Sequence, residues 1–293
     1  MTSFRFNFNI SSEDQQEVEK SDRDNEPSPG QHCKEAIEIV CDRIPDIDKQ
    51  QVESIVLGND DQQMQYINAK YVEKFLTDNK ECATSGLITA IENNSDLVPS
   101  VYEGGLKVWE CSFDLVEYFQ EQSIQFRGKN VIELGCGAGL PGIYALNKAA
   151  KRVDFQDYNE EVIRYVTVPN VFLNCSSKSP KQQIKKKCHF YAGDWSNMGN
   201  VLQDGGNNRY DFVLTSETIY SEESQDKLYK LIKGLLKENG VAYIAAKTIY
   251  FGVGGGTRAF EALVSNDNYF QCEVCKRITL GVNREILRLH RSP

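Results

Sequence analysis

The chain has 293 residues, of which 40% are hydrophobic and 26% are charged, and this composition is that of a folded protein with a sizeable core. Its net charge of −9 disfavours a protein whose whole surface binds nucleic acid, and no run of residues approaches the roughly 18 apolar positions of a membrane span. The nine scattered cysteines, in a chain whose first residues lack the pattern of a signal peptide, favour reduced thiols in the cytosol or nucleus over a disulfide framework.

The first thirty residues carry seven acids against three bases, which predicts an acidic, mostly disordered leader over residues 1–30. Within it, Phe4, Phe6 and Phe8 alternate, and this favours a short docked strand over a partner-binding motif. Residues 31–97 are predicted to form a partly helical extension. Apolar residues at helical spacing predict a helix from Cys33 to Ile44, ended by Pro45.

From residue 98 to residue 293 the pattern becomes regular and predicts one α/β domain. A helix is predicted over Trp109–Gln122. Strands are predicted at Asn130–Leu134, Arg152–Phe155, His189–Ala192, Asp211–Leu214, Ala242–Ala246, Glu273–Ile278 and Glu285–His290. Helical stretches separate the first five strands, while the last two face each other across residues 280–283. The predicted fold is therefore Rossmann-like, with a seven-strand sheet of five parallel strands plus a carboxyl-terminal antiparallel hairpin.

The most specific motif spans residues 131–139 (VIELGCGAG), where a buried strand runs into a glycine-rich turn and then a helix. Glycine is needed where a ligand lies against bare backbone. A dinucleotide site prefers G-x-G-x-x-G, whereas this motif reads acid-x-G-x-G-x-G. Glu133 would repel a pyrophosphate but suits the cationic amine of S-adenosylmethionine, directly or through water. Gly135 and Gly137 are predicted to hold that cofactor; the alternative is a tight turn without a ligand.

Two further strand ends suit the nucleoside part of this cofactor. Asp157 falls twenty residues after Gly137, the separation at which an acid accepts the ribose hydroxyls in nucleoside-binding α/β folds; an ordinary loop acid is the alternative. Asp194 is predicted to accept the adenine amine, and Trp195 either stacks on the ring or packs in the core. Trp109 either covers the cofactor or simply begins its helix.

Polar residues also follow the fourth strand. Ser216, Glu217 and Tyr220 stand where the carboxyl ends of parallel strands face a ligand crevice, so they are predicted to lie on the substrate side. The Asn/Asp-Pro-Pro-Tyr sequence typical of enzymes that methylate base amines in DNA or RNA is absent, and DNA is not a predicted partner.

Three other patterns are interpreted as structural. Cys272 and Cys275 form a single C-x-x-C, and residues three apart in a strand face opposite sides, so no zinc site is predicted. The histidines at positions 32, 189 and 290 are isolated and suggest neither a triad nor a metal centre. The lysines at 178, 181 and 185–187 are interpreted as a solvated loop, with a nuclear-import signal or a ribosomal RNA contact as the alternative.

Four segments together resemble the histidine protein methyltransferases, which are seven-strand, S-adenosylmethionine-dependent enzymes. They are residues 101–111 (VYEGGLKVWEC), 155–159 (FQDYN), 215–220 (TSETIY) and 250–256 (YFGVGGG). The last is the most diagnostic, since a triple glycine after the fifth strand is not a general methyltransferase feature. The resemblance covers residues 98–293 well, the extreme amino terminus loosely, and the region between poorly.

The resemblance implies transfer of a methyl group to a ring nitrogen of a histidine in large-subunit ribosomal protein three. It also implies a cytosolic and nuclear or nucleolar location. Cofactor contacts are implied from Val108, Trp109, Glu110, Cys111, Ser112, Glu133, Gly135, Gly137, Asp157, Tyr158, Asn159, Gly193, Asp194, Trp195 and Ser216. The family often has Asp at the position of Glu133, a conservative departure. For such a reaction, Glu217 or Tyr220 is predicted to hydrogen-bond one imidazole nitrogen and so leave the other facing the methyl group.

Two other functions compete with histidine methylation. Residues 217–220 also fit the acid-x-x-Tyr pattern of protein lysine methyltransferases with the same sheet plan. The third function, from another class, is a non-catalytic subunit that binds the cofactor or assists ribosome assembly.

Overall fold

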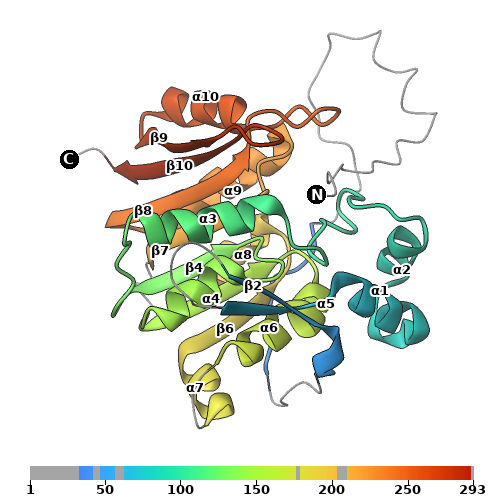
Figure 1. Ribbon diagram of the computed structural model, residues 1–293. Helices are drawn as coiled ribbons and strands as arrows, with labels where there is room; N and C mark the ends of the chain where they lie inside the picture. The colour runs from blue at the N-terminus through green and yellow to red at the C-terminus, as the bar shows by residue number, and fades with distance from the viewer. Residues whose placement is uncertain (1–32, 42–46, 57–62, 176–178, 203–209, 292–293) are drawn as a thin grey trace, which may run out of the picture.

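The computed structural model describes residues 33–41, 47–56, 63–175, 179–202 and 210–291 (Figure 1). The leader predicted over residues 1–30, with Phe4, Phe6 and Phe8, lies outside the described residues. Among the described helices, none is long and apolar enough to cross a bilayer.

Eight strands form one sheet in the order β1-β6-β5-β4-β7-β8-β10-β9. Its strands are β1 (Ile37–Glu38), β4 (Asn130–Leu134), β5 (Arg152–Asp157), β6 (Cys188–Ala192), β7 (Tyr210–Ser216), β8 (Leu236–Lys247), β9 (Phe270–Ile278) and β10 (Arg284–Arg291). The strands β4 to β8 pair in parallel, and β10 lies antiparallel between β8 and β9. The predicted Rossmann-like sheet of five parallel strands and a carboxyl-terminal hairpin is confirmed.

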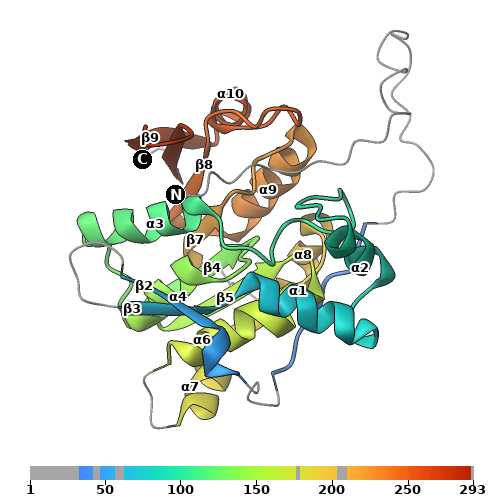
Figure 2. The same ribbon diagram turned by 45° about the vertical axis from the view of Figure 1, so that its right-hand side comes forward.

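Helices cover both faces of the sheet, as expected for parallel strands joined by helical crossovers (Figures 1 and 2). One face carries α3 (Glu110–Glu121), α4 (Leu140–Asn147) and α6 (Val168–Leu173), and the other carries α8 (Trp195–Leu202), α9 (Glu222–Leu235) and α10 (Thr257–Asp267). Each face has its own apolar cluster. The first includes Phe119 and Ile143, and the second includes Ile232 and Phe260, all fully buried. These two layers fix the strand ends that form the site.

The helix predicted over Cys33–Ile44 is wrong. The described part of this segment is extended, and its β1 pairs antiparallel with β6. The backbone N–H of Ile39 continues the pairing by donating to the Phe190 carbonyl at 2.7 Å. Ile39 is buried while its two neighbours, Glu38 and Val40, are exposed, as expected where successive residues of an edge strand face opposite sides. The apolar residues whose spacing suggested a helix therefore belong to an extended segment that pairs with β6.

The rest of the amino-terminal extension packs against the α/β layers. It consists of η1 (Lys49–Gln51), β2 (Val52–Val56), β3 (Gln63–Ile67), α1 (Ala69–Asp78), η2 (Lys80–Cys82) and α2 (Ser85–Glu92). The β2–β3 hairpin is joined to α6, because the Asn170 side chain accepts the Ile67 N–H at 2.8 Å and Asn174 accepts that of Gln65 at 3.0 Å. The predicted boundary between residues 97 and 98 stays a prediction.

The described residues now place members of all three patterns that were interpreted as structural. The lysines at 185–187 form the last turn of α7 (Pro180–Lys187), not a loop, and Lys185 and Lys186 are exposed. Cys272 packs against the apolar cluster of one sheet face and Cys275 against that of the other, as the strand geometry predicted. His189 contacts Glu38 and His290 contacts Glu273, while His32 lies outside the described residues.

Candidate functional site

A cleft of about 1110 Å³, counting its open mouth, lies at the carboxyl ends of β4, β5, β6 and β7. The sheet order reverses between β4 and β7, and open α/β sheets bind ligands at such a point. Thirteen predicted site residues line the cleft, namely Val108, Trp109, Ser112, Gly135, Gly137, Asp157, Tyr158, Gly193, Asp194, Trp195, Ser216, Glu217 and Tyr220. Residues that are separated by over one hundred positions in the sequence thus share one cavity.

The glycine turn after β4 is held from behind. Gly135 and Gly137 have φ angles of 58° and 47°, in the left-handed region that favours glycine. The Thr167 hydroxyl donates to the Gly137 carbonyl at 2.7 Å, and the Asn170 amide donates to the Ala138 carbonyl at 3.0 Å. Thr167 ends a π-helical turn (η3, Ile163–Thr167), a distortion often found at functional sites. The bare backbone of the turn is therefore presented to the cleft in one conformation.

Glu133 lies beneath this turn and is fully buried, so it does not line the cleft. Its Oε2 accepts the Gly142 N–H at 2.7 Å, while its Oε1 has no hydrogen-bond partner in the described part of the chain. Burial raises the pKa of this carboxyl well above its usual range. The structure therefore does not support the direct contact with a cofactor amine. A water-mediated contact remains a prediction.

Asp157 is the carboxylate that reaches the cleft wall beside the glycine turn. Its Oδ2 accepts the Gly137 N–H at 2.9 Å and its Oδ1 accepts the Asn159 N–H at 3.1 Å. Burial raises its pKa to about 6, and these two backbone donors oppose the rise. Each oxygen keeps a free lone pair, so the group can accept hydrogen bonds from vicinal hydroxyls. Asn159 itself is buried outside the lining, where its amide donates to the Val101 carbonyl.

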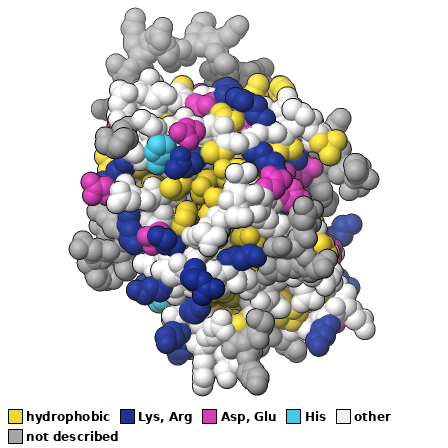
Figure 3. Space-filling view, turned by 60° about the vertical axis from the view of Figure 1, so that its left-hand side comes forward, with side chains coloured by type: hydrophobic (Ala, Val, Ile, Leu, Met, Phe, Trp, Pro, Cys, Tyr) yellow, Lys and Arg dark blue, Asp and Glu magenta, His cyan; other side chains and the backbone are white. Residues whose placement is uncertain are grey.

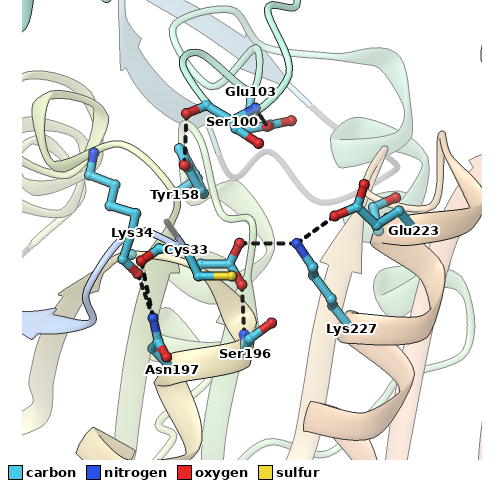
Figure 4. Close-up of polar contacts among 12 residues, drawn as sticks. Cys33, Lys34, Ser100, Glu103, Tyr158, Ser196, Asn197, Glu223 and Lys227 are labelled. Carbon is cyan, nitrogen blue, oxygen red and sulfur yellow. Dashed lines mark hydrogen bonds and ion pairs between the residues drawn. The ribbon is translucent and has the colours of Figure 1, made fainter. Parts of the chain in front are cut away.

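The loop after β6 lines the cleft next to the end of β5 (Figure 4), where the Gly193 N–H donates to the Asp157 carbonyl at 3.1 Å. The Asp194 Oδ1 accepts the Ser196 N–H at 2.8 Å, and Oδ2 pairs with Lys227, which also pairs with Glu223. The Trp195 indole N–H donates to Gln156 at 2.7 Å, which fixes the ring at the wall. A Cβ at Gly193 would lie 2.3 Å from the Glu35 carbonyl, so this glycine admits the segment before β1. This close contact between two backbones explains why a residue without a Cβ is needed at position 193.

The segment at the start of α3 divides between the cleft and the protein interior. Val108, Trp109 and Ser112 line the cleft, and the Ser112 hydroxyl lies 3.3 Å from that of Ser216. Glu110 and Cys111 do not line it. Glu110 pairs with Arg284 at 3.1 Å, and Cys111 is fully buried in the helix interface. Neither residue is placed to contact a cofactor, because successive residues of a helix point in different directions.

Glu217 follows β7 in the left-handed conformation, with a φ of 59°. Its Oε2 accepts a hydrogen bond from the Tyr250 hydroxyl and lies 3.8 Å from Lys247 Nζ. Its side chain is 3% exposed, and burial raises its pKa while Lys247 lowers it. The carboxylate is therefore used inside the protein. Its other oxygen, Oε1, has no hydrogen-bond partner in the described part of the chain, and the residue lines the cleft, so the predicted contact between this carboxylate and an acceptor imidazole stays a prediction.

Tyr220 and Glu103 meet across the cleft. The Tyr220 hydroxyl donates to Glu103 Oε2. Glu103 Oε1 accepts the Ser100 N–H at 2.8 Å (Figure 4). Burial raises the pKa of Tyr220 and of Glu103, and their mutual hydrogen bond lowers that of Glu103. The phenol therefore stays neutral with its proton toward the carboxylate, and its oxygen can still accept a hydrogen bond. Tyr220 is thus more than a packing residue.

The sequence prediction missed Glu103, Lys227, Thr218 and Gln156, all of which line or brace the cleft. Glu103 lies in the segment VYEGGLKVWEC, but nothing in its spacing pairs it with Tyr220, which is 117 positions away. Lys227 is a half-buried residue of α9 and has no motif around it. Gln156 directly precedes Asp157, and its role is to brace Trp195 and Gly193.

A protein-family model described as "Lysine methyltransferase" matches residues 93–251. The chain is 35% identical to the Bos taurus "Histidine protein methyltransferase 1 homolog", covering 77% of this chain and 65% of the relative. It is 43% identical to the Dictyostelium discoideum homolog of the same name, covering 67% of this chain and 61% of the relative. The Schizosaccharomyces pombe "Histidine protein methyltransferase 1" is 32% identical, with 68% of each chain covered. The chain thus spans about two thirds of the length of these relatives.

Among solved structures, a Streptococcus mutans protein assigned to the S-adenosylmethionine-dependent methyltransferases matches with a TM-score of 0.50. The match has 9% sequence identity and covers 83% of this chain and 56% of the other. At that identity the likeness concerns the fold alone.

Proposed function

The chain belongs to the histidine protein methyltransferase family, and on this premise we propose that it transfers a methyl group from S-adenosylmethionine to a ring nitrogen of a protein histidine. The observation that carries the proposal is the Tyr220–Glu103 pair on the wall of the cleft. It offers one oriented hydrogen-bond acceptor, backed by a carboxylate, beside the glycine turn.

The described residues fit this cofactor. Gly135 and Gly137 give bare backbone, Asp157 gives a two-oxygen acceptor for the ribose, and Trp195 gives an aromatic face for the adenine. The buried Glu133 Oε1, without a partner, is an acceptor that a water beneath the turn would satisfy. When bound, S-adenosylmethionine supplies an electrophilic methyl group on a sulfonium.

The acceptor histidine needs orientation more than deprotonation. Its reference pKa is about 6.5, so the imidazole is mostly neutral at pH 7, with one lone pair and one N–H. The Tyr220 oxygen accepts that N–H, which turns the lone pair of the other nitrogen toward the methyl group. Glu103, bonded to the same phenol, stabilises the cationic product through it. Tyr220 thus fixes the tautomer and Glu103 supports it.

Kinetics with a histidine peptide test this role. Tyr220→Phe removes the acceptor oxygen and is expected to lower kcat by about a hundredfold, the usual effect of lost orientation, while cofactor affinity is kept. The matched control is Tyr229→Phe, because the hydroxyl of Tyr229, on α9, donates to Asp267 on α10, away from the cleft. Equal rates for the two variants would remove Tyr220 from the mechanism.

A second candidate is protein lysine methylation, which the description of the matching family model favours. Lysine has a reference pKa of about 10.4, so its rate would keep rising above pH 9, whereas a histidine acceptor gives a rate that rises through about pH 6–7 and then levels. A pH–rate profile of the wild type therefore separates the two acceptors.

The substrate is proposed to be large-subunit ribosomal protein three, and the location cytosolic and nuclear. A basic edge opposite the cleft supports a local contact with ribosomal RNA. Lys129, Lys151 and Lys187 immediately precede β4, β5 and β6, and Lys185 and Lys186 project from α7. No acid occurs between Glu161 and Asp194 in the sequence. Figure 3 shows Lys and Arg side chains in the lower part of this face, near α7.

Reversing two of these charges tests the RNA contact. Lys185→Glu with Lys186→Glu is expected to weaken binding to a 20-base-pair RNA duplex and to reduce its dependence on salt, because each lost phosphate contact lowers that slope by about one. Methylation of a short histidine peptide should not change. Identical salt dependence in variant and wild type would exclude these lysines from RNA binding.

A further inference from the structure

Two loops at the mouth of the cleft expose large apolar side chains. One follows β8 and contains Ile249 and Phe251, which are 52% and 82% exposed. The other joins β9 to β10 and contains Leu280 and Val282, which are 77% and 43% exposed. These four side chains, named here the rim patch, are four of seven exposed large apolar residues in the described part of the chain. Isolated exposure is ordinary, but such a concentration marks an interaction surface.

The sheet topology places the rim patch at the same edge as the cleft. β10 runs antiparallel to both β8 and β9, so β8 and β9 are parallel to each other and end at the same side. The Thr248 N–H donates to the Asn283 carbonyl at 3.0 Å, which joins the two loops. Val253, in the first loop, lines the cleft itself. The patch therefore lies at the same edge of the sheet as the cleft, and its first loop reaches the cleft wall through Val253.

Hydrogen bonds to the backbone hold both loops in place. The Gly254 N–H donates to the Tyr250 carbonyl at 3.2 Å, and the Gly255 N–H donates to the carbonyl of Tyr220 at 3.0 Å. In the other loop, Arg284 Nη1 donates to the Leu280 and Val282 carbonyls while its other nitrogens bind Asp114 in α3. Apolar side chains on fixed backbones lose little entropy on binding, which suits a built contact surface.

The charged residues that line the cleft indicate which kind of substrate polymer can bind there. Its lining holds five acids, Glu103, Asp157, Asp194, Glu217 and Glu223, against two lysines, Lys107 and Lys227. Both lysines are paired with carboxylates, Lys107 with Asp96 and Lys227 with Asp194 and Glu223. A nucleic acid would be repelled here, whereas a basic peptide segment would be attracted.

We infer that the rim patch docks the substrate protein through an apolar segment next to the acceptor residue, with basic residues entering the acidic cleft. This inference rests on the proposed methyl transfer to a protein. It adds the chemistry of the flanking sequence, which is apolar and basic. Docking outside the cleft would let the enzyme select its substrate by residues that do not react.

Binding of designed peptides to the full chain tests the inference. The probe has a central histidine, Lys residues beside it and a Leu-Phe flank; a matched probe has Ser-Ser in that flank. The wild type is expected to bind the Leu-Phe probe at least tenfold more tightly. Phe251→Ser with Leu280→Ser should abolish this preference, and Val56→Ser, which changes an exposed valine of β2, should retain it. No preference in the wild type, or a preference kept by the double variant, would overturn the inference.

A lysine-centred version of the Leu-Phe probe separates docking from the proposed reaction. Docking predicts that it binds the wild type as tightly as the histidine probe and loses affinity equally in the double variant. Only the histidine probe should gain a methyl group. Methylation of the lysine probe alone would contradict the proposed function while leaving the docking surface in place. Preference for a Glu-flanked probe over the Lys-flanked one would contradict the basic partner.

Discussion

At the scale of single residues, Asp157 couples cofactor binding to pH. Its raised pKa, about 6, means that the carboxylate is ionised at pH 7.5 and mostly protonated at pH 5. The ionised form accepts from the ribose hydroxyls, so affinity for S-adenosylmethionine is expected to fall as the pH drops through about 6. Asp157→Ala should weaken binding by about 2–3 kcal/mol at pH 7.5, the worth of hydrogen bonds to a charged group. Calorimetric titration at several pH values measures both effects.

The control for this titration is Asp157→Asn, which keeps the shape of the side chain but cannot ionise. Its affinity is expected to be lower than that of the wild type and constant between pH 5 and 7.5. If the wild-type affinity for S-adenosylmethionine does not change over this pH range, another group accepts the hydrogen bonds of the ribose hydroxyls.

Glu217 is expected to matter for stability more than for the reaction. Its carboxylate is buried against Tyr250 and near Lys247, so Glu217→Ala leaves a buried cation without this partner. Loss of one member of a buried pair costs about 3 kcal/mol or more. Glu92→Ala, at an exposed pair with Lys80, should change the free energy of unfolding by less than about 1 kcal/mol. Urea denaturation compares the two. A stable but inactive Glu217→Ala variant would restore Glu217 as the group that contacts the acceptor.

At the scale of elements, Gly254 and Gly255 in the loop after β8 differ in their roles. A Cβ at Gly255 would lie 2.2 Å from the Tyr220 backbone. A Cβ at Gly254 would have no atom within 4 Å, so the cost of a side chain there is the strain of its φ of 81°. Gly255→Ala is therefore expected to lower the melting temperature strongly and to disturb Tyr220. Gly254→Ala should cost about 1 kcal/mol and spare cofactor affinity. Thermal denaturation tests this order, and equal melting temperatures for the two variants would contradict it.

The elements also show where sequence patterns suffice. The strands that form the centre of the sheet have long buried runs bounded by glycines and polar turns, so their sequence defines them locally. The segment at 33–41 has no such local signal. Ile39 becomes buried only because β6 offers an unpaired edge, and that partner lies about 150 positions away in the sequence. A helical interpretation of its apolar residues could not include this contact.

At the scale of the whole molecule, the cofactor side of the site was largely predictable and the acceptor side was not. Gly135, Gly137 and Asp157 lie in motifs whose spacing follows from the sheet, and the structure places all three at the cleft. The roles of Glu217 and Tyr220 depend on partners in other segments, Tyr250 for one and Glu103 for the other. Because Glu217 and Tyr220 are close in sequence, both were predicted to contact the acceptor imidazole. Their different hydrogen-bond partners in the folded chain give them different roles.

The central claim is that a histidine ring nitrogen receives the methyl group, and the chemical identity of the product tests it most directly. Large-subunit ribosomal protein three is incubated with the purified enzyme and with S-adenosylmethionine that carries a label in its methyl group. The ribosomal protein is then hydrolysed in acid, and its amino acids are separated. The account predicts that the label is found in methylhistidine, with the wild type and not with Tyr220→Phe at equal enzyme concentration. Label in methyllysine would contradict it.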